Sequence, residues 1–356
     1  MAINYATQFA PKVAETFAKE SLTDSACGQD YQFTGTKTIK VMTLDTVPLG
    51  DYQREGLNRY GQPVELGDTY QELTVGEDKA FAITIDKGNN ADQMNLKGAT
   101  EALKRQVAQV VIPYIDKYRL SRWAKLAGIK KAYTSTQMGS GLLEAIFDAG
   151  AAMDNAGVPL TGRTLFIPNT YYKKLALSNQ VIGVDKIGEK ALGKGVVGEI
   201  DGMEVKRVPD SYLPTGVYFV AKWKGATADP VKLQEGKIHK DPPGISGNLL
   251  EGRVYHDSFV LSAKSSGIYA AVDTSVEVKN PTVTEDSTGK VTVSAGKTSH
   301  TVVYTTDGSD PRFSPTAKEV SSTGLTGAKG ETVKFAAVDP DTGFTSNGVV
   351  EHTFSK

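Results

Sequence analysis

The spacing of apolar residues predicts two helices of very different length in the first third of the chain. Phe9, Val13 and Phe17 recur at steps of four, which predicts a short amphipathic helix over residues 5–19. This helix has no apolar partner nearby in the sequence, so we expect an arm that packs on another element or another molecule. Residues 97–126 carry the longest periodic run, formed by Leu103, Val107, Val110, Val111, Tyr114 and Tyr118.

The long run predicts a helix of about 30 residues, which would measure about 45 Å at 1.5 Å per residue. Pro113 lies inside it and removes one backbone hydrogen bond, so we expect a kink one turn earlier, near Gln109.

Between the two helices the hydrophobic period changes to two. Ile39 and Val41, and then Phe81, Ile83 and Ile85, alternate with polar residues, which indicates β-strands. The intervening residues 45–67 are rich in Gly, Asp, Arg, Tyr and Pro. They predict an extended hairpin loop that projects from the body, and loops of this length are uncommon unless they bind something.

A compact α/β region follows the long helix. Its first expected element is a helix that ends at Gly157, with apolar positions at Leu142, Leu143, Ile146, Ala149 and Met153. The other expected elements are a buried strand at 164–167, a helix from Asn169 to Leu177, a two-residue turn at Asp201-Gly202, and strands at 217–221, 249–256 and 268–272.

From about residue 273 the composition shifts to Thr, Ser, Val and Gly. Short strands are expected at 282–284, 291–294, 301–305, 332–338 and 349–354, without any helix pattern, which favours a small β-sandwich.

Composition and charge exclude several classes of function. In 356 residues, 40 Lys and Arg face 41 Asp and Glu, and this net charge of −1 argues against a dedicated nucleic-acid binder. The single cysteine, Cys27, excludes an intramolecular disulfide, and the four histidines never occur at a metal-ligand spacing. We therefore expect no metal and no cofactor. The first residues lack a signal-peptide pattern, so we also expect a soluble intracellular product.

Four further features are interpreted as structural rather than as catalytic or ligand-binding. The stretch 188–195 approaches a phosphate-binding loop and 193–198 a dinucleotide fingerprint, but no strand-to-helix context surrounds them, so a flexible loop with Lys186, Lys190 and Lys194 is the preferred interpretation. Cys27 has no histidine nearby in sequence, which favours a structural role. Trp123 and Trp223 are interpreted as packing residues. Two basic pairs, Lys104-Arg105 and Lys130-Lys131, are interpreted as solvated helix positions that could instead face an enclosed polyanion.

Two stretches carry a resemblance to a known family. They are 154–175 (DNAGVPLTGRTLFIPNTYYKKL) and 197–209 (VGEIDGMEVKRVP). Together with the order of the elements, they make residues 1–272 similar to tailed-phage major capsid proteins of the Hong Kong 97 type. The resemblance implies an α+β fold with an N-terminal arm (1–37), an E-loop hairpin (38–90), a spine helix with peripheral domain (91–136), an apical domain (137–222) and a return to the peripheral domain (223–272).

The tail carries a second resemblance. Residues 303–311 (VYTTDGSDP) resemble the hairpin of the immunoglobulin-like module of chitobiases, with Tyr304, Asp307, Gly308, Asp310 and Pro311 as its marked positions. Residues 275–356 are thus expected to form an immunoglobulin-like β-sandwich on the outer surface, available to a surface glycan. As an appendage, it should be removable without loss of assembly.

The capsid resemblance implies a non-enzymatic structural protein. It would form hexamers and pentamers of an icosahedral shell around double-stranded DNA, assembled in the host cytoplasm with separate scaffold, portal and decoration proteins and only nonspecific DNA contact. Residues expected at subunit contacts are Asp51, Tyr52, Arg54, Arg59 and Tyr60 in the loop, and Phe9, Val13 and Phe17 in the arm; Leu103, Val107, Val111, Tyr114 and Tyr118 form the spine-helix core.

The alternative is a carbohydrate-active enzyme or a surface-binding protein that carries the chitobiase-like module. That function needs a secretion signal or a pair of carboxylates in an aromatic cleft, and the sequence shows neither.

Overall fold

A six-stranded sheet at the centre of the molecule is buried on both faces. The computed structural model describes residues 20–28, 37–44, 47, 49–55, 58–63, 65–92, 98–177, 196–321 and 324–355. The predicted arm helix with Phe9, Val13 and Phe17 lies outside these residues, as does most of the glycine-rich loop. The sheet contains, in spatial order, β4 (Ile129–Tyr133), β13 (Ile268–Asp273), β8 (Val217–Trp223), β5 (Arg163–Pro168), β7 (Met203–Val208) and β6 (Val196–Ile200).

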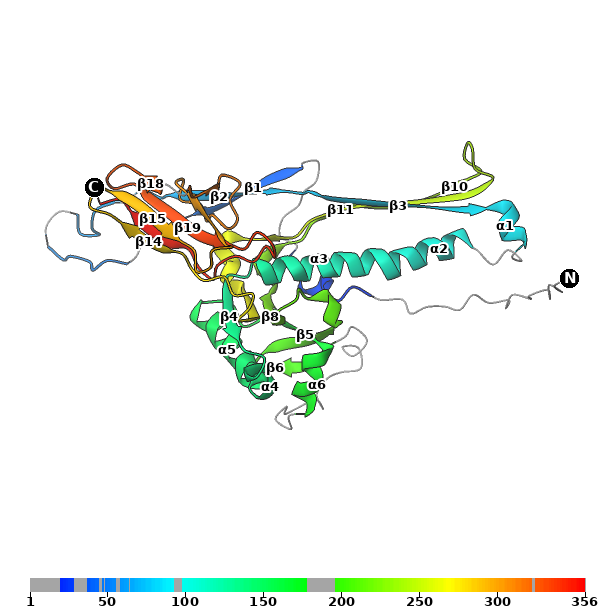
Figure 1. The fold of residues 1–356 in the computed structure, drawn as a ribbon, viewed down its shortest axis with the longest axis horizontal. Coiled ribbons are helices and arrows are strands. Elements are labelled where there is room, and N and C mark those ends of the chain that lie inside the picture. Colours follow the sequence, from blue (N-terminus) through cyan, green and yellow to red (C-terminus); the bar gives the residue numbers. More distant parts are fainter. Residues whose placement is uncertain are drawn as a thin grey trace.

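Alternation along these strands divides the core into two layers. On β5, Leu165 and Ile167 face a cluster with α5 (Leu142–Asn155), whereas Phe166 faces a second cluster that contains Trp123 of the long helix. Successive side chains of a strand point to opposite faces, so a sheet covered on both sides requires continuous apolar strands. The short helix α4 (Gln137–Ser140) and α6 (Asn169–Leu177) complete the α/β region below the sheet in Figure 1.

The predicted long helix is continuous but changes its pitch. It consists of α2 (Ala99–Gln106), a π-helical stretch (Val107–Val111) and α3 (Ile112–Lys125). The backbone N–H of Ile112 donates to the carbonyl of Val107, five residues earlier. A π-helical stretch therefore occupies the place near Gln109 where the kink is predicted, just before Pro113, and the kink itself stays a prediction.

The projecting hairpin pairs differently from the expectation. Strand β1 (Thr38–Leu44) is antiparallel to β2 (Asp68–Thr74), a strand that the sequence analysis missed, and the loop between them covers 45–67. The predicted strand around Phe81 is β3 (Glu77–Asp86), which pairs with β11 (Gly247–His256) instead, and β11 pairs with β10 (Val231–Lys240). Figure 1 shows this three-stranded sheet running along α2, away from the hairpin.

Short elements connect these units. They are the 3₁₀ turns Asp24–Ala26, Asp210–Tyr212, Lys224–Ala226 and Ser262–Gly267, the helix α1 (Lys87–Asp92), and the strand pair β9 (Thr227–Ala228) and β12 (Phe259–Val260). Two turn predictions are confirmed: Asp201 and Gly202 both adopt positive φ (51° and 68°), and Gly157 ends α5 with φ 72°.

The C-terminal region is all-β, as expected. One sheet contains β14 (Thr282–Glu285), β15 (Lys290–Ser294) and β18 (Leu325–Thr326); the other contains β17 (Lys318–Glu319), β16 (Thr301–Thr305), β19 (Thr332–Val338) and β20 (Val350–Thr353). Both sheets contribute to one apolar cluster that includes Val291, Val302 and Phe335. We call residues 275–356 the C-terminal module; its immunoglobulin-like topology stays a prediction.

An N-terminal segment that the sequence analysis did not single out is fixed to the body by buried polar groups. The carboxylate of Asp116, on α3, accepts hydrogen bonds from the Ser21 hydroxyl (2.7 Å), the Leu22 N–H (2.9 Å) and the Thr23 hydroxyl (2.6 Å). The ammonium of Lys222 donates to the carbonyl of Ala26. Residues 20–28 are thereby held against the spine helix.

We expect Asp116→Ala to lower the free energy of unfolding by about 3 kcal/mol, because it leaves several buried donors without an acceptor. Asp148→Ala is the matched control: Asp148 is a partly exposed carboxylate that pairs with Lys131, and its loss should cost less than about 1 kcal/mol. Denaturant titration of the purified protein measures both. Equal destabilisation would contradict the anchoring role of Asp116.

Candidate functional site

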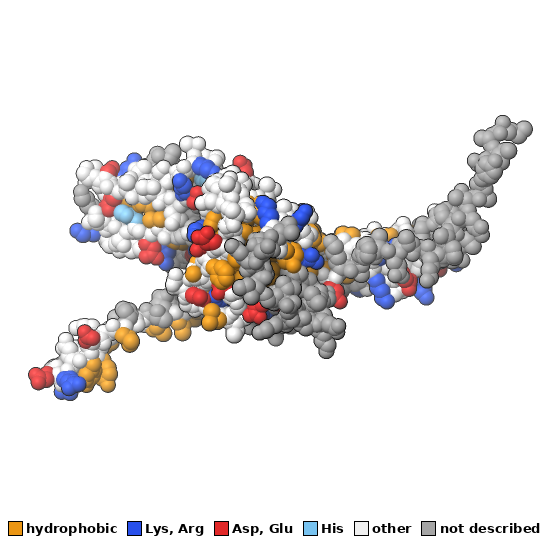
Figure 2. All heavy atoms as spheres, turned by 90° about the horizontal axis from the view of Figure 1, so that it is seen from below, with side chains coloured by type: hydrophobic (Ala, Val, Ile, Leu, Met, Phe, Trp, Pro, Cys, Tyr) orange, Lys and Arg blue, Asp and Glu red, His pale blue; other side chains and the backbone are white. Residues whose placement is uncertain are grey.

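Exposed apolar side chains gather on the projecting hairpin. Among the described residues, thirteen large hydrophobic side chains are exposed, and eight of them lie between residues 42 and 70. These eight are Met42, Leu44, Val47, Leu49, Tyr52, Tyr60, Leu66 and Tyr70. Figure 2 shows hydrophobic side chains along the projecting hairpin, at the left of the molecule. Single exposed apolar residues are normal on a protein surface, whereas a concentration of them on one thin element makes this hairpin the candidate interaction site.

The tip of the hairpin loop is locally ordered around two tyrosines. The rings of Tyr52 and Tyr60 meet edge to face with centroids 5.0 Å apart, and the Gln53 N–H donates to the Arg59 carbonyl (3.0 Å). All five predicted contact residues, Asp51, Tyr52, Arg54, Arg59 and Tyr60, are exposed. The loop thus presents aromatic and charged groups together, which is the composition of interface hot spots.

Of the five predicted core positions of the long helix, Val111 is buried, Leu103, Val107 and Tyr118 are half-buried, and Tyr114 is exposed rather than part of a core. Leu103 lies against Gly236 of β10, where a Cβ would come within 3.0 Å of the leucine. Val111 clusters with Ile115, Val254 and partly buried Phe81. Val107 belongs to the π-helical stretch and is half-buried. The helix therefore stiffens the extended sheet along much of its length.

A buried histidine lies where the spine helix meets this sheet. His256, at the end of β11, is fully buried, and neither ring nitrogen has a hydrogen-bond partner among the described residues. The rings of Tyr114 and Tyr118 pack edge to face on it at 5.8 and 5.3 Å, and their hydroxyls donate to Glu77 and Asp257. Burial, followed by the charge of Arg119, lowers the pKa of His256 below its ordinary 6.5.

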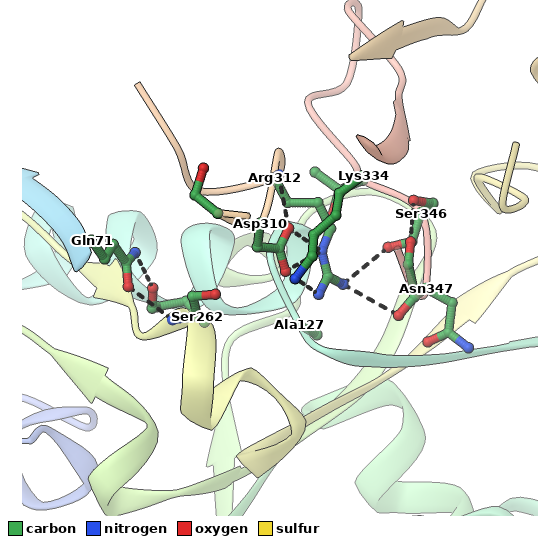
Figure 3. Close-up of polar contacts among 12 residues, drawn as sticks. Gln71, Ala127, Ser262, Asp310, Arg312, Lys334, Ser346 and Asn347 are labelled. Atoms are coloured by element: carbon green, nitrogen blue, oxygen red, sulfur yellow. Dashed lines mark hydrogen bonds and ion pairs between the residues drawn. The ribbon is translucent and has the colours of Figure 1, made fainter. Parts of the chain in front are cut away.

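A cleft separates the root of the hairpin from the C-terminal module. Its volume is about 370 Å³, and the lining includes Thr43, Tyr70 and Gln71 from the hairpin and Asp310, Phe313 and Lys334 from the module. Figure 3 shows the Arg312 guanidinium between the Asp310 carboxylate (2.7 Å) and the carbonyls of Ser346 and Asn347. Because Glu351 also pairs with Lys334 (3.1 Å), the carboxylates of the cleft are already neutralised by cations.

The marked positions of the module are structural. Tyr304 packs in the apolar cluster beside Phe335, and Pro311 is buried. The Asp307 carboxylate accepts from the Ser309 N–H (3.0 Å) and the Thr316 hydroxyl (2.6 Å), while Gly308 adopts φ 78°. These contacts stabilise the connection that leads from β16 to β17.

Several isolated candidates have structural roles. Cys27 is buried, donates to the Thr23 carbonyl (3.3 Å), and has a pKa raised by burial, which disfavours the reactive thiolate. Trp123 is buried and donates to Asp229 and Ser258. The interpretation of Lys130 and Lys131 as helix positions is wrong, because both lie on β4. Lys131 is exposed, whereas Lys130 is half-buried and desolvation lowers the pKa of its ammonium well below the ordinary value.

Neither a metal site nor a spanning helix is found in the described part of the chain. No group of three or more His, Cys, Asp and Glu side chains there could hold a metal ion. No helix among the same residues is long and apolar enough to cross a membrane.

Comparison with solved structures identifies the fold. A structure from Mycobacterium phage Che8 matches with a TM-score of 0.59 at 16% identity, covering 76% of this chain and 96% of the other. The capsid structure of cyanophage P-SCSP1u gives 0.60 at 16%, covering 76% and 93%, and the mature capsid of bacteriophage PhiM1 gives 0.56 at 12%, covering 77% and 93%. The chain has the fold of phage capsid structures.

The capsid fold accounts for about three quarters of the chain, and nearly the whole of each solved chain is matched. The remaining quarter is the size of the C-terminal module. Neither a family model nor a curated protein matches the sequence.

We expect the capsid fold of this chain to lose stability below pH 6.5 because of His256. The unfolded chain protonates this imidazole near pH 6.5, whereas the folded chain does so only at lower pH, so the free energy of unfolding falls as the pH drops through this window. The slope contributed by His256 is at most about 1.4 kcal/mol per pH unit.

Denaturant titration between pH 7.5 and 5.0 measures this effect. His256→Phe should flatten the profile relative to that of the wild type. Parallel profiles for the wild type and His256→Phe would refute the assignment.

Proposed function

We propose that this protein is a phage major capsid protein that assembles into a closed shell. The observation that carries the proposal is the combination of a capsid fold with a thin hairpin on which eight large apolar side chains are exposed in the single subunit. Exposing eight large apolar side chains on the projecting hairpin does not stabilise a monomer. A neighbouring copy that covers the hairpin would bury them.

The shell would have the Hong Kong 97 architecture. The hairpin would lie across an adjacent subunit, and the spine helix with the three-stranded sheet would form the wall. Head-to-tail contacts of this kind are heterologous, so they close only when rotation generates rings, here hexamers and pentamers of an icosahedral head. Obligate interfaces of this type bury more than about 2,000 Å².

The remaining partners follow from that architecture. The shell would enclose double-stranded DNA through nonspecific contacts, consistent with a net charge of −1, and would use separate scaffold, portal and decoration proteins in the host cytoplasm. The C-terminal module would form an immunoglobulin-like sandwich on the outer surface, where it could meet a glycan. The chain would carry out no catalysis.

The carbohydrate-active alternative gains no support from the cleft beside the module. A glycosidase needs one carboxylic acid and one carboxylate free to act on the sugar. In this cleft Asp310 pairs with Arg312 and Glu351 pairs with Lys334.

The hairpin is the element to test. Deleting residues 51–61 should abolish assembly, because the tip with Tyr52 and Tyr60 is lost, while the far-ultraviolet circular dichroism of the subunit stays unchanged. Light scattering and electron microscopy of the purified protein, with and without its scaffold, measure assembly.

Point variants test whether the two tyrosines at the tip of the hairpin matter for assembly more than an exposed aromatic side chain elsewhere does. Tyr52→Ser with Tyr60→Ser should reduce the yield of shells at least tenfold, whereas Phe147→Ser, an exposed aromatic residue on α5, should not. Full assembly of the double variant would contradict the role of the tip. A wild-type protein that remains a monomer and hydrolyses a glycan would refute the capsid function itself.

A further inference from the structure

A loop of the C-terminal module lies on the end of the spine helix. Residues 343–347, between β19 and β20, contain Phe344, whose side chain is 2% exposed and belongs to the main apolar cluster of the body with Leu120, Trp123 and Ala124. Ala337, at the end of β19, belongs to the same cluster. The module therefore contributes part of the core of the body, in addition to its own separate cluster.

This loop makes hydrogen bonds to a backbone carbonyl at the C-terminal end of α3. The last carbonyls of an α-helix have no partner within the helix. α3 ends at Lys125, and the Lys125 carbonyl accepts from the Thr345 hydroxyl (3.2 Å) and the Thr345 N–H (3.4 Å). A residue 220 positions later in the sequence thus caps the spine helix.

Lys130 closes the contact from the other side. Its ammonium donates to the Ala127 carbonyl (2.6 Å) and the Thr345 hydroxyl (3.0 Å), and its backbone N–H donates to the side-chain oxygen of Asn347 (2.5 Å). Because its acceptors lie on both sides of the contact, the half-buried Lys130 links the segment after α3 to the loop of residues 343–347 by hydrogen bonds.

The loop is itself held in shape, and the connection between body and module is packed as well. Arg312 joins Asp310 to the carbonyls of Ser346 and Asn347, as Figure 3 shows. In the connecting segment, Val278 is buried in the main cluster, and the Asn280 side chain accepts from the Gly348 N–H (2.9 Å). The module is attached at two separate places, which prevents it from swinging about a single linker.

We propose that residues 343–347 are a docking loop that fixes the C-terminal module rigidly on the end of the spine helix, so that the module clamps the subunit and is not a detachable binding arm. This weighs against the expectation that the module can be removed after Val272 without loss of assembly, because such a chain lacks Val278, Ala337 and Phe344 in its main core. Any external partner then meets the module at a fixed orientation. The proposal does not depend on shell formation.

Hydrogen exchange of the full-length protein, followed by mass spectrometry, tests the docking loop. Thr345→Val preserves the shape of the side chain but removes the hydroxyl that contacts Lys125 and Lys130. Backbone amides of residues 126–130 should then exchange about tenfold faster, because two hydrogen bonds across the contact are lost.

Thr332→Val is the matched control. The Thr332 hydroxyl pairs with that of Thr353 (2.9 Å) within the module, so its loss should leave residues 126–130 at the wild-type rate. Phe344→Ala should accelerate the same amides by more than Thr345→Val does.

Unchanged exchange at residues 126–130 in both Thr345→Val and Phe344→Ala would overturn the proposal, as would wild-type exchange of these amides at the rate of unstructured chain. Where Phe344→Ala does not yield folded protein, the comparison of Thr345→Val with Thr332→Val decides alone. Neither result bears on assembly, so failure here is distinguishable from failure of the capsid function.

Discussion

The packing of α3 on the six-stranded sheet is the contact on which the other units depend. Leu120, Trp123 and Ala124 are fully buried at the centre of the main core. Each side of the same helix holds a different unit: Asp116 and Arg119 hold the N-terminal segment, and Tyr114 and Tyr118 meet the end of β11. If α3 did not pack on the sheet, the N-terminal segment and the end of β11 would both lose the contacts that hold them in place.

The polar groups along α3 explain how one helix can serve several neighbours. Apolar contacts stabilise packing without specifying one geometry, whereas a buried carboxylate or guanidinium destabilises the fold unless it is hydrogen-bonded or paired. Arg119, 3% exposed, bonds the Thr23 hydroxyl (3.0 Å) and pairs with Asp24 (2.5 Å). Its Nε has no partner among the described residues, so the position of the N-terminal segment on the helix is set by the Nη1 contacts of Arg119 and by the carboxylate of Asp116.

The sequence predicts those parts of the fold that are held by local or periodic apolar patterns. The spine helix, α5, the buried strands β5, β8 and β13 and the Asp201-Gly202 turn follow from the periods of 3.6 and 2 and from turn chemistry. Strands β2 and β10 escape prediction because their sequences, DTYQELT and VKLQEGKIHK, are largely polar and are held by backbone pairing with distant strands. The half-burial of Lys130 and the burial of His256 also have no local signal, since Thr345, which contacts Lys130, and Tyr114, which packs on His256, are each more than a hundred positions away.

The exposure of the candidate contact residues was predictable for a related reason, whereas their role in subunit contacts stays a prediction. A loop with Tyr52 and Tyr60 but few core-forming residues cannot build a core of its own, and its apolar groups remain exposed in the structure. The rest of the subunit buries comparable side chains at Trp123, Phe166, Phe219 and Phe344, including one supplied by the C-terminal module. Most of the large apolar side chains that the described part of the subunit leaves exposed lie on the one projecting hairpin, so covering this hairpin would remove more apolar surface from water than covering any of the five exposed side chains found elsewhere.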